Sequence, residues 1–361
     1  MKITGVALAV LTLIVMQTAA HADAVADQCA SAGGAFIDAL DDPQRQKAVH
    51  PFAIPERRAW AYVTGSKSRK QGLAMGELTD GQRVLAHRLI HCAMSTQGYQ
   101  KTAGVMRMDD LVRENIATII TSGAIEIGKE FYWLAIFGEP QTAEPWGWQL
   151  EGHHLGLNFT SIDGAVAVTP AFMGADPAEV QNGPLAGWRL LGGEEERAYA
   201  LVTSLTESQR RQAVIGDEIP RGIFTLPGRA DALQEYSGLS AAALSGPQRQ
   251  LLWLLMDEYV QNMEPSIADR IIGGVLQDGW DRLYFAWMGS TEYGGVMYYR
   301  IHGPSLLIEF DHASTVLNPK LGPNSNHIHT IMRVPGRDFG EDLLQQHYLN
   351  SPAHQAPRTE K

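Results

Sequence analysis

The chain has 361 residues, a formal net charge of −11 and 45% hydrophobic residues. A chain of this length can bury a large core, in one large domain or two of medium size. The acidic balance excludes nucleic acid as a partner, because binding to it needs a basic surface. It also offers no dense run of positive charge for an anionic membrane surface.

Residues 1–22 have the pattern of a signal peptide. Lys2 supplies the positive start, residues 6–16 form the apolar segment, and Ala20-His21-Ala22 fits the small-x-small cleavage rule. We therefore expect the mature chain to begin at Asp23 and to be periplasmic or secreted. No later stretch approaches about 18 uninterrupted apolar residues, so we expect no membrane span.

The chain has two cysteines, Cys29 and Cys92. An oxidising compartment permits a disulfide between them. We expect this bond, which would pin the N-terminal helix to the helix that contains Cys92. The alternative is a pair of buried free thiols.

Three segments share a helix-capping pattern, at residues 78–83, 205–210 and 244–249. In each, a Thr or Ser caps the helix and a Gln three residues later reaches back to the cap amide (Thr79, Thr206 and Ser245). The first and third of these capping patterns predict helices over residues 84–95 and 250–263.

Strand patterns follow each helical region. The first group covers residues 130–137, 146–151, 155–160 and 165–169, and the second covers 283–287, 296–302, 305–311 and 327–334. The fold class is therefore α+β, with capped helices packed on antiparallel sheets. We divide the chain into an N-terminal helical segment (23–75), a first α+β half (76–199), a second (200–350) and a tail (351–361).

The two halves correspond loosely. Residues 149–152 match 300–303, and residues 157–159 match 308–310. This suggests an internal duplication of two helix-plus-meander halves, although chance similarity is the alternative. Duplication would let two like sheets face each other, with residues 222–237 as the connection between the halves.

Asn326-His327-Ile328-His329 is the sharpest chemical motif. In a strand, residues i and i+2 share a face, so His327 and His329 project together. Neutral imidazole binds Zn, Cu, Fe and Ni, and three ligands leave an open position. We expect these two histidines to bind metal, with Asn326 orienting one ring. The alternative is a polar patch hydrogen-bonded to a carboxylate.

A second cluster reads Glu151-Gly152-His153-His154. A bulge at Gly152 would bring both histidines inward, and we expect one of the two to join the metal site. The alternative is that the pair caps a strand end.

Carboxylates and a further histidine complete the candidate set. Glu309 and Asp311 share a strand face, while His302 precedes a Gly-Pro turn. Glu151, Glu309 and Asp311 are candidates for general base, because a positioned carboxylate can accept a proton from water or substrate. His302 is a further candidate metal ligand. His87 and His91 on a helix fall off its apolar face, and we interpret them as solvent-facing.

The chain resembles the domain-of-unknown-function 3500 family. The resemblance rests on residues 146–160, 300–304 and 326–329, followed by Arg333 and residues 338–340, and it covers about residues 35 to 350. It implies an exported bacterial protein with a site but no settled reaction. The stretch from His312 to Ser325 is longer than is typical of relatives.

The leading interpretation is an exported metal-dependent enzyme, with zinc as the first choice of metal and copper or iron as alternatives. Hydrolysis is slightly favoured over oxidation, because the clusters contain no Met or Cys that would mark a redox copper site. Its substrate would be a small molecule, a saccharide or a peptide-like compound. The competing interpretations are a copper- or iron-dependent oxidase, a periplasmic protein that binds metal or a small ligand without catalysis, and a metal-free catalyst or sugar binder. The sequence leaves the oligomeric state open.

Overall fold

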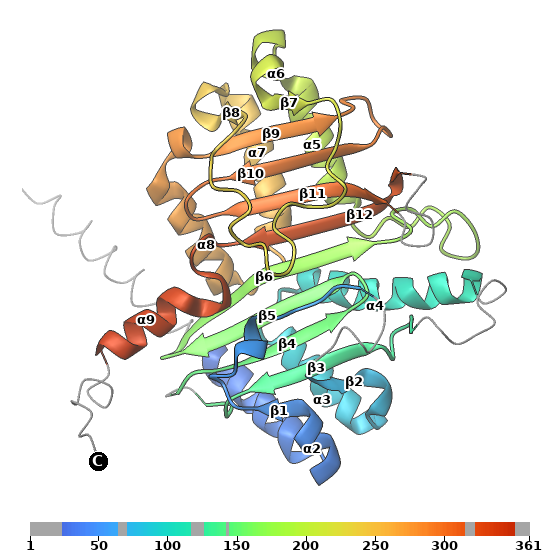
Figure 1. Cartoon of the computed structure of the whole chain (residues 1–361), viewed down its shortest axis with the longest axis vertical. Coiled ribbons are helices and arrows are strands. Elements are labelled where there is room, and N and C mark those ends of the chain that lie inside the picture. Colours follow the sequence, from blue (N-terminus) through green and yellow to red (C-terminus); the bar gives the residue numbers. More distant parts are fainter. Residues whose placement is uncertain (1–23, 64–70, 117–125, 142–143, 315–321, 351–361) are drawn as a thin grey trace, which may run out of the picture.

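The computed structural model describes residues 24–63, 71–116, 126–141, 144–314 and 322–350. The expected signal peptide and the tail at residues 351–361 lie outside these residues. One large sheet organises the chain, and helices pack on it (Figure 1), which confirms the α+β class.

Within the described residues, the sheet has twelve strands in the order β1-β3-β4-β5-β6-β12-β11-β10-β9-β7, with β2 on β3 and β8 on β9. The first six are β1 (Val49–His50), β2 (Leu73–Ala74), β3 (Tyr132–Phe137), β4 (Trp146–Gly152), β5 (Leu155–Ile162) and β6 (Ala165–Ala175). The others are β7 (Val214–Gly216), β8 (Leu239–Ser240), β9 (Tyr284–Gly289), β10 (Met297–His302), β11 (Leu307–Ser314) and β12 (Pro323–Arg333). The eight strands expected from the sequence are therefore present, with ends shifted by a few residues.

A helix covers residues 24–38. The named helices are α2 (Asp42–Ala48), α3 (Asp80–His91), α4 (Thr96–Ile116), α5 (Gly192–Ser204), α6 (Glu207–Ala213), α7 (Gly246–Val260), α8 (Pro265–Asp278) and α9 (Glu341–Asn350), the last preceded by the 3-10 turn η7 (Asp338–Gly340). Helices α4, α5 and α7 lie behind the sheet in Figure 1, while the β1–β2 and β7–β8 connections cross its front.

In the part of the chain that the structure describes, four α-helices start with a reciprocal capping box. The three expected at Thr79, Thr206 and Ser245 are confirmed, and a fourth forms at Asp41 with Gln44. The capping glutamines also bond to each other in pairs, Gln44 with Gln82 and Gln209 with Gln248. Each pair therefore ties two helix starts together.

The two meanders join edge to edge rather than face to face. β3–β6 and β9–β12 are each antiparallel meanders, and β6 pairs with β12 to make one continuous sheet. The expectation of two facing sheets is wrong, because the open edge strands of the two meanders hydrogen-bond to each other. Residues 222–237 lie between β7 and β8, two strands that both pair with β9 of the second meander. This segment therefore belongs to the second half and does not connect the two halves. Duplication itself stays an interpretation, which this repeated topology favours.

The two faces of the sheet differ in chemistry. The helix-covered face carries the main apolar core, which includes Leu134, Ile328 and Phe310. On the opposite face, directly paired residues form a row across the sheet: Glu151, Gly156, Phe172, Ile331, Glu309 and Arg300. Paired residues share a face, so this loop-covered face holds buried charge beside a small aromatic cluster.

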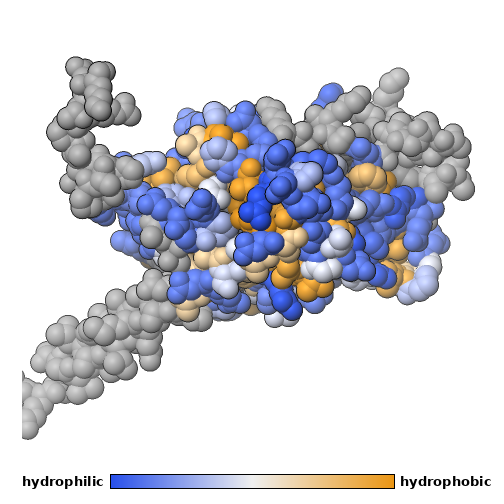
Figure 2. Space-filling view, turned by 90° about the horizontal axis from the view of Figure 1, so that it is seen from below, coloured by the Kyte–Doolittle hydropathy of each residue, from blue (hydrophilic) through white to orange (hydrophobic). Residues whose placement is uncertain are grey.

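The disulfide between Cys29 and Cys92 is confirmed, with Cα atoms 5.2 Å apart. It joins the helix at residues 24–38 to the end of α3. Among the described residues, no helix is both long and apolar enough to cross a bilayer. The face in Figure 2 is largely hydrophilic, with hydrophobic residues in small separate patches.

Candidate metal centre

β12 carries two histidines of the site on one face, as the sequence predicts. The rings of His327 and His329 have centroids 4.7 Å apart, whereas Ile328 packs into the main core on the other face. β12 lies between β6 and β11, so both rings sit near the middle of the sheet rather than at an edge.

The third histidine comes from a turn rather than a strand. β4 ends at Gly152 and β5 begins at Leu155, so His153 and His154 form the tight turn between them. His154 has a φ of 60°, in the left-handed region that residues other than glycine seldom adopt. A side chain on Gly174 would meet the His154 ring at 2.8 Å, so the glycine makes room for it. Such strain commonly marks functional positions.

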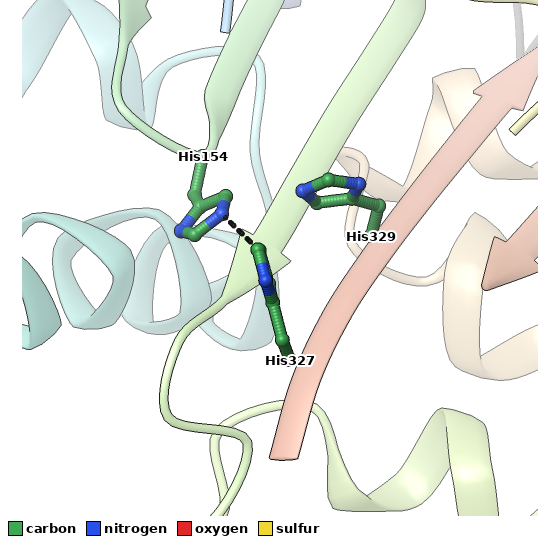
Figure 3. Close-up of side chains that lie close together, drawn as sticks. All are labelled: His154, His327 and His329. Carbon is green, nitrogen blue, oxygen red and sulfur yellow. Dashed lines mark hydrogen bonds between the residues drawn. The ribbon is translucent and has the colours of Figure 1, made fainter. Parts of the chain in front are cut away.

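The two histidine clusters converge although 173 residues separate them. His154 Nε2 lies 2.8 Å from His327 Nε2. One ligand atom from each of His154, His327 and His329 lies within 4.8 Å of the others (Figure 3). The prediction that ring nitrogens of the two clusters lie within about 5 Å is confirmed. Zinc with ligands at about 2.0–2.1 Å brings such atoms about 3.3 Å apart, which needs only small movements here.

Carboxylates stand behind two of these rings. His329 Nδ1 lies 3.5 Å from Asp311 Oδ1, and His327 Nδ1 lies 3.9 Å from Asp176 Oδ2. Neither ring nitrogen, nor either oxygen of the fully buried Asp311, has a hydrogen-bond partner among the described residues. Metal-bound histidines usually give their second nitrogen to a carboxylate, so the arrangement fits a metal centre that tightens on loading.

Burial keeps the three rings neutral. It lowers the pKa of His327 to about 3, with smaller effects from His153 and His312. It also lowers the pKa of His154 and His329 well below the usual value, and neighbouring histidines lower both further. Neutral imidazole is the form that binds metal.

His153 belongs to a neighbouring group. Its Nδ1 lies 2.7 Å from Asp109 Oδ1 on α4, and Tyr132 donates to the other oxygen of Asp109. Ligand atoms of Asp109, His153 and His154 also lie within 4.8 Å of one another. The ring centroids of His153 and His154 are 3.8 Å apart, so the two groups adjoin.

Two of the three candidate bases hold loops. Buried Glu309 accepts hydrogen bonds from Phe224 N, Thr225 N, Thr225 Oγ1 and Tyr298 OH. Glu151 accepts one from Ala61 N at 2.7 Å. Only Asp311 among the three stands beside a histidine of the cluster, because it pairs directly with His329 across β11 and β12.

Residues 60–62, in the connection between β1 and β2, cover the histidine cluster. The Tyr62 carbonyl accepts from His154 N at 2.9 Å, and its ring lies 5.4 Å from that of His329 and 4.5 Å from that of Phe172. Trp60 packs on Phe172 beside it. The three histidines are consequently only 3%, 1% and 8% exposed in chain order.

Other sequence candidates lie elsewhere. His302 on β10 pairs with Leu307 on β11, which pairs with Arg333 on β12. Since Arg333 is four residues after His329, His302 lies two strands across and four residues along from His329, on the order of 16 Å from it. Its ring packs against Tyr236. The side-chain oxygen of Asn326, which was expected to orient a ring, accepts a hydrogen bond from Glu179 N.

His87 is also not simply solvent-facing. Its ring contacts Tyr99 beside a cavity of about 860 Å³ between α3 and the helix at residues 24–38, and His91 lines the same cavity.

Sequence reasoning missed Asp109, Asp176 and Tyr62. One signal was available for Asp109: it falls four residues after Val105 on the buried side of α4, where a carboxylate is unusual. Asp176 follows β6, and its place beside His327 depends on the pairing of β6 with β12. No local sequence pattern predicts that pairing.

The fold and the site define an α+β protein with one large sheet and a buried histidine cluster at its centre. The chain belongs to the family described as "Protein of unknown function (DUF3500)", which matches residues 22–341. This confirms the resemblance found in the sequence motifs. Neither the curated proteins nor the solved structures contain a match to the chain.

Proposed function

We propose that this protein is an exported metal-dependent enzyme whose metal is held by His154, His327 and His329. The observation that carries the proposal is the convergence of these three neutral, buried imidazoles within 4.8 Å. The carboxylates behind His327 and His329 add the orienting partners that such ligands need.

Zinc is the first choice of metal, with copper and iron as alternatives. Three imidazoles without a Cys or Met ligand suit a zinc site with one open position. A divalent metal bound there would lower the pKa of a bound water toward about 7 and polarise a carbonyl or phosphoryl oxygen. Hydrolysis is therefore the reaction that we favour, and copper or iron in the same site would favour oxidation.

The chain's own residues would shape the site. Asp311 would hold the His329 ring through Nδ1, and Asp176 would do the same for His327. Tyr62, Trp60 and Phe172 would exclude bulk water and give the substrate an aromatic wall. A small molecule, a saccharide or a peptide-like compound would fit such a wall.

Export is the second part of the proposal. The disulfide at Cys29 and Cys92 supports it, because disulfides persist mainly in oxidising compartments. Secretion with retention of this bond, measured by thiol titration of the cell-free fraction, would test it.

The competing function is metal or ligand binding without catalysis. The burial of all three rings favours it, since a closed site would release metal slowly and admit no substrate. Azide added to the cobalt-loaded protein separates the two functions: a shifted visible spectrum indicates an open position, and an unchanged spectrum favours a closed binding site.

Metal content tests the proposal. Tag-free protein is stripped with a chelator, reloaded with zinc, desalted and analysed for bound zinc. We expect His329→Ala to lose the zinc held at the three-histidine site, because two ligands hold zinc poorly. The matched control is His302→Ala, another buried strand histidine, which should bind as wild type does. Equal zinc in His329→Ala and wild type would overturn the proposal.

A further inference from the structure

The neighbourhood of the three-histidine site holds more metal-binding groups than one cation needs. Asp109 on α4 and His153 in the β4–β5 turn form a second cluster, and His154 lies within 4.8 Å of both. Asp109 is 1% exposed, and its carboxylate faces His153 at 2.7 Å. This group occupies the side of the turn that faces α4, while His327 occupies the other side.

Asp176 lies where the two clusters meet. It follows the last residue of β6, next to Ala175, which pairs with Ile328 of β12. Its Oδ2 is 3.9 Å from His327 Nδ1. The same carboxyl interacts electrostatically with both His153 and Asp109. Asp176 therefore adds a carboxyl group beside both clusters while it stands behind the His327 ring.

We propose that the centre holds two divalent cations: one on His154, His327 and His329, and a second on Asp109 and His153. This inference rests on the proposed function, because it adds a second cation beside the first. The rings of His153 and His154, one at each site, have centroids 3.8 Å apart, so the two cations would be neighbours.

The burial of Asp109 supports a cation at this position. A carboxylate that is 1% exposed is costly to bury without a compensating positive charge, and a divalent cation held by Asp109 and His153 would supply one.

The alternative is that Asp109 and His153 form a self-contained ion pair, with Tyr132 holding the carboxylate. In that case Asp109 merely orients a ring, and the protein binds one metal. Stoichiometry distinguishes the two arrangements without any knowledge of the substrate.

The test measures zinc bound per chain. Tag-free, chelator-stripped protein is titrated with zinc, and the bound metal is counted by elemental analysis and native mass spectrometry. We expect two zinc ions in wild type and one in Asp109→Asn. The matched control is Asp163→Asn, another Asp–His pair, with His347 at 2.9 Å, at the far end of β6 roughly 30 Å away. It should keep two.

One zinc in wild type would overturn the inference while leaving the three-histidine site intact. Two zinc ions in Asp109→Asn would overturn it as well, because the second ion would then lie elsewhere. No bound zinc at all would instead overturn the proposed function. Should Asp109→Asn fail to fold, X-ray absorption of the cobalt-loaded wild type decides: a cobalt–cobalt distance of about 3.5–4 Å supports the pair, and its absence refutes it.

Discussion

Replacement of Glu309 by Gln should destabilise the fold rather than remove a catalytic base. The carboxylate is fully buried and accepts four hydrogen bonds. Its two oxygens each take one backbone N–H, from Phe224 and from Thr225. A glutamine keeps only one oxygen, so one of these backbone donors must face an NH2 group. The hydroxyls of Thr225 and Tyr298 can rotate, but the backbone N–H cannot.

The magnitude follows from these contacts. A buried donor without a partner costs about 1–3 kcal/mol, and bonds to a charged acceptor contribute about 1.5–3 kcal/mol against about 0.5–1.5 for neutral ones. One orphan donor and three bonds weakened by about 1–1.5 kcal/mol each together give about 4–7 kcal/mol. This is a large part of the roughly 5–15 kcal/mol that stabilises a typical domain.

Urea unfolding of metal-free protein measures the effect. The control is Glu207→Gln, a surface residue whose side chain is 88% exposed and paired with Arg211, for which we expect no measurable change. Zinc content of folded Glu309→Gln should equal that of wild type. A loss below about 1 kcal/mol would refute the anchoring role, and the general-base interpretation from the sequence would then be favoured.

Three further predictions concern charge and covalent constraint. Burial, and then Glu309, raise the pKa of Asp311, so the charged form of this carboxyl is penalised in the fold. Asp311→Asn should therefore stabilise metal-free protein at pH 7, yet weaken zinc binding about 10–100-fold. Weaker zinc binding without stabilisation would contradict this prediction. The His327 pKa of about 3 lies below its value in the unfolded chain, so the unfolded chain takes up the proton first. The stability of metal-free protein should therefore fall as the pH drops from about 6.5 toward 3. If the stability of His327→Gln fell equally steeply with pH, His327 would not be the cause. Replacing both Cys29 and Cys92 by Ser should cost about 4 kcal/mol by the chain-entropy estimate for a separation of 63 residues, and a cost near zero in urea unfolding would contradict it.

The features that local chemistry decides could be predicted from the sequence. The capping boxes depend on hydrogen bonds between residues three apart, and three of the four were identified. The fourth was missed because Asp41, rather than Thr or Ser, fills the cap. The shared face of His327 and His329 follows from the two-residue period of a strand. The disulfide was expected because the signal-peptide pattern at residues 1–22 would direct the chain to an oxidising compartment.

Features that depend on pairing between distant strands could not be predicted. β6 and β12 are joined by hydrogen bonds between segments about 150 residues apart, and this contact brings Asp176 to His327. The sequence also cannot separate a carboxylate that holds a loop from one that accepts a proton. Glu309 is of a residue type that often acts as a base, but the hydrogen bonds that it accepts from Phe224 N and Thr225 N show that it anchors residues 224–225.

Anomalous diffraction from zinc-soaked crystals tests the central claim most directly. A peak at the zinc edge should lie about 2.0–2.1 Å from one ring nitrogen of each of His154, His327 and His329. The His329 ring should at the same time close its 3.5 Å gap to Asp311. A fully loaded crystal with no peak among these three rings, or with its strongest peak at His87 and His91, would contradict the account.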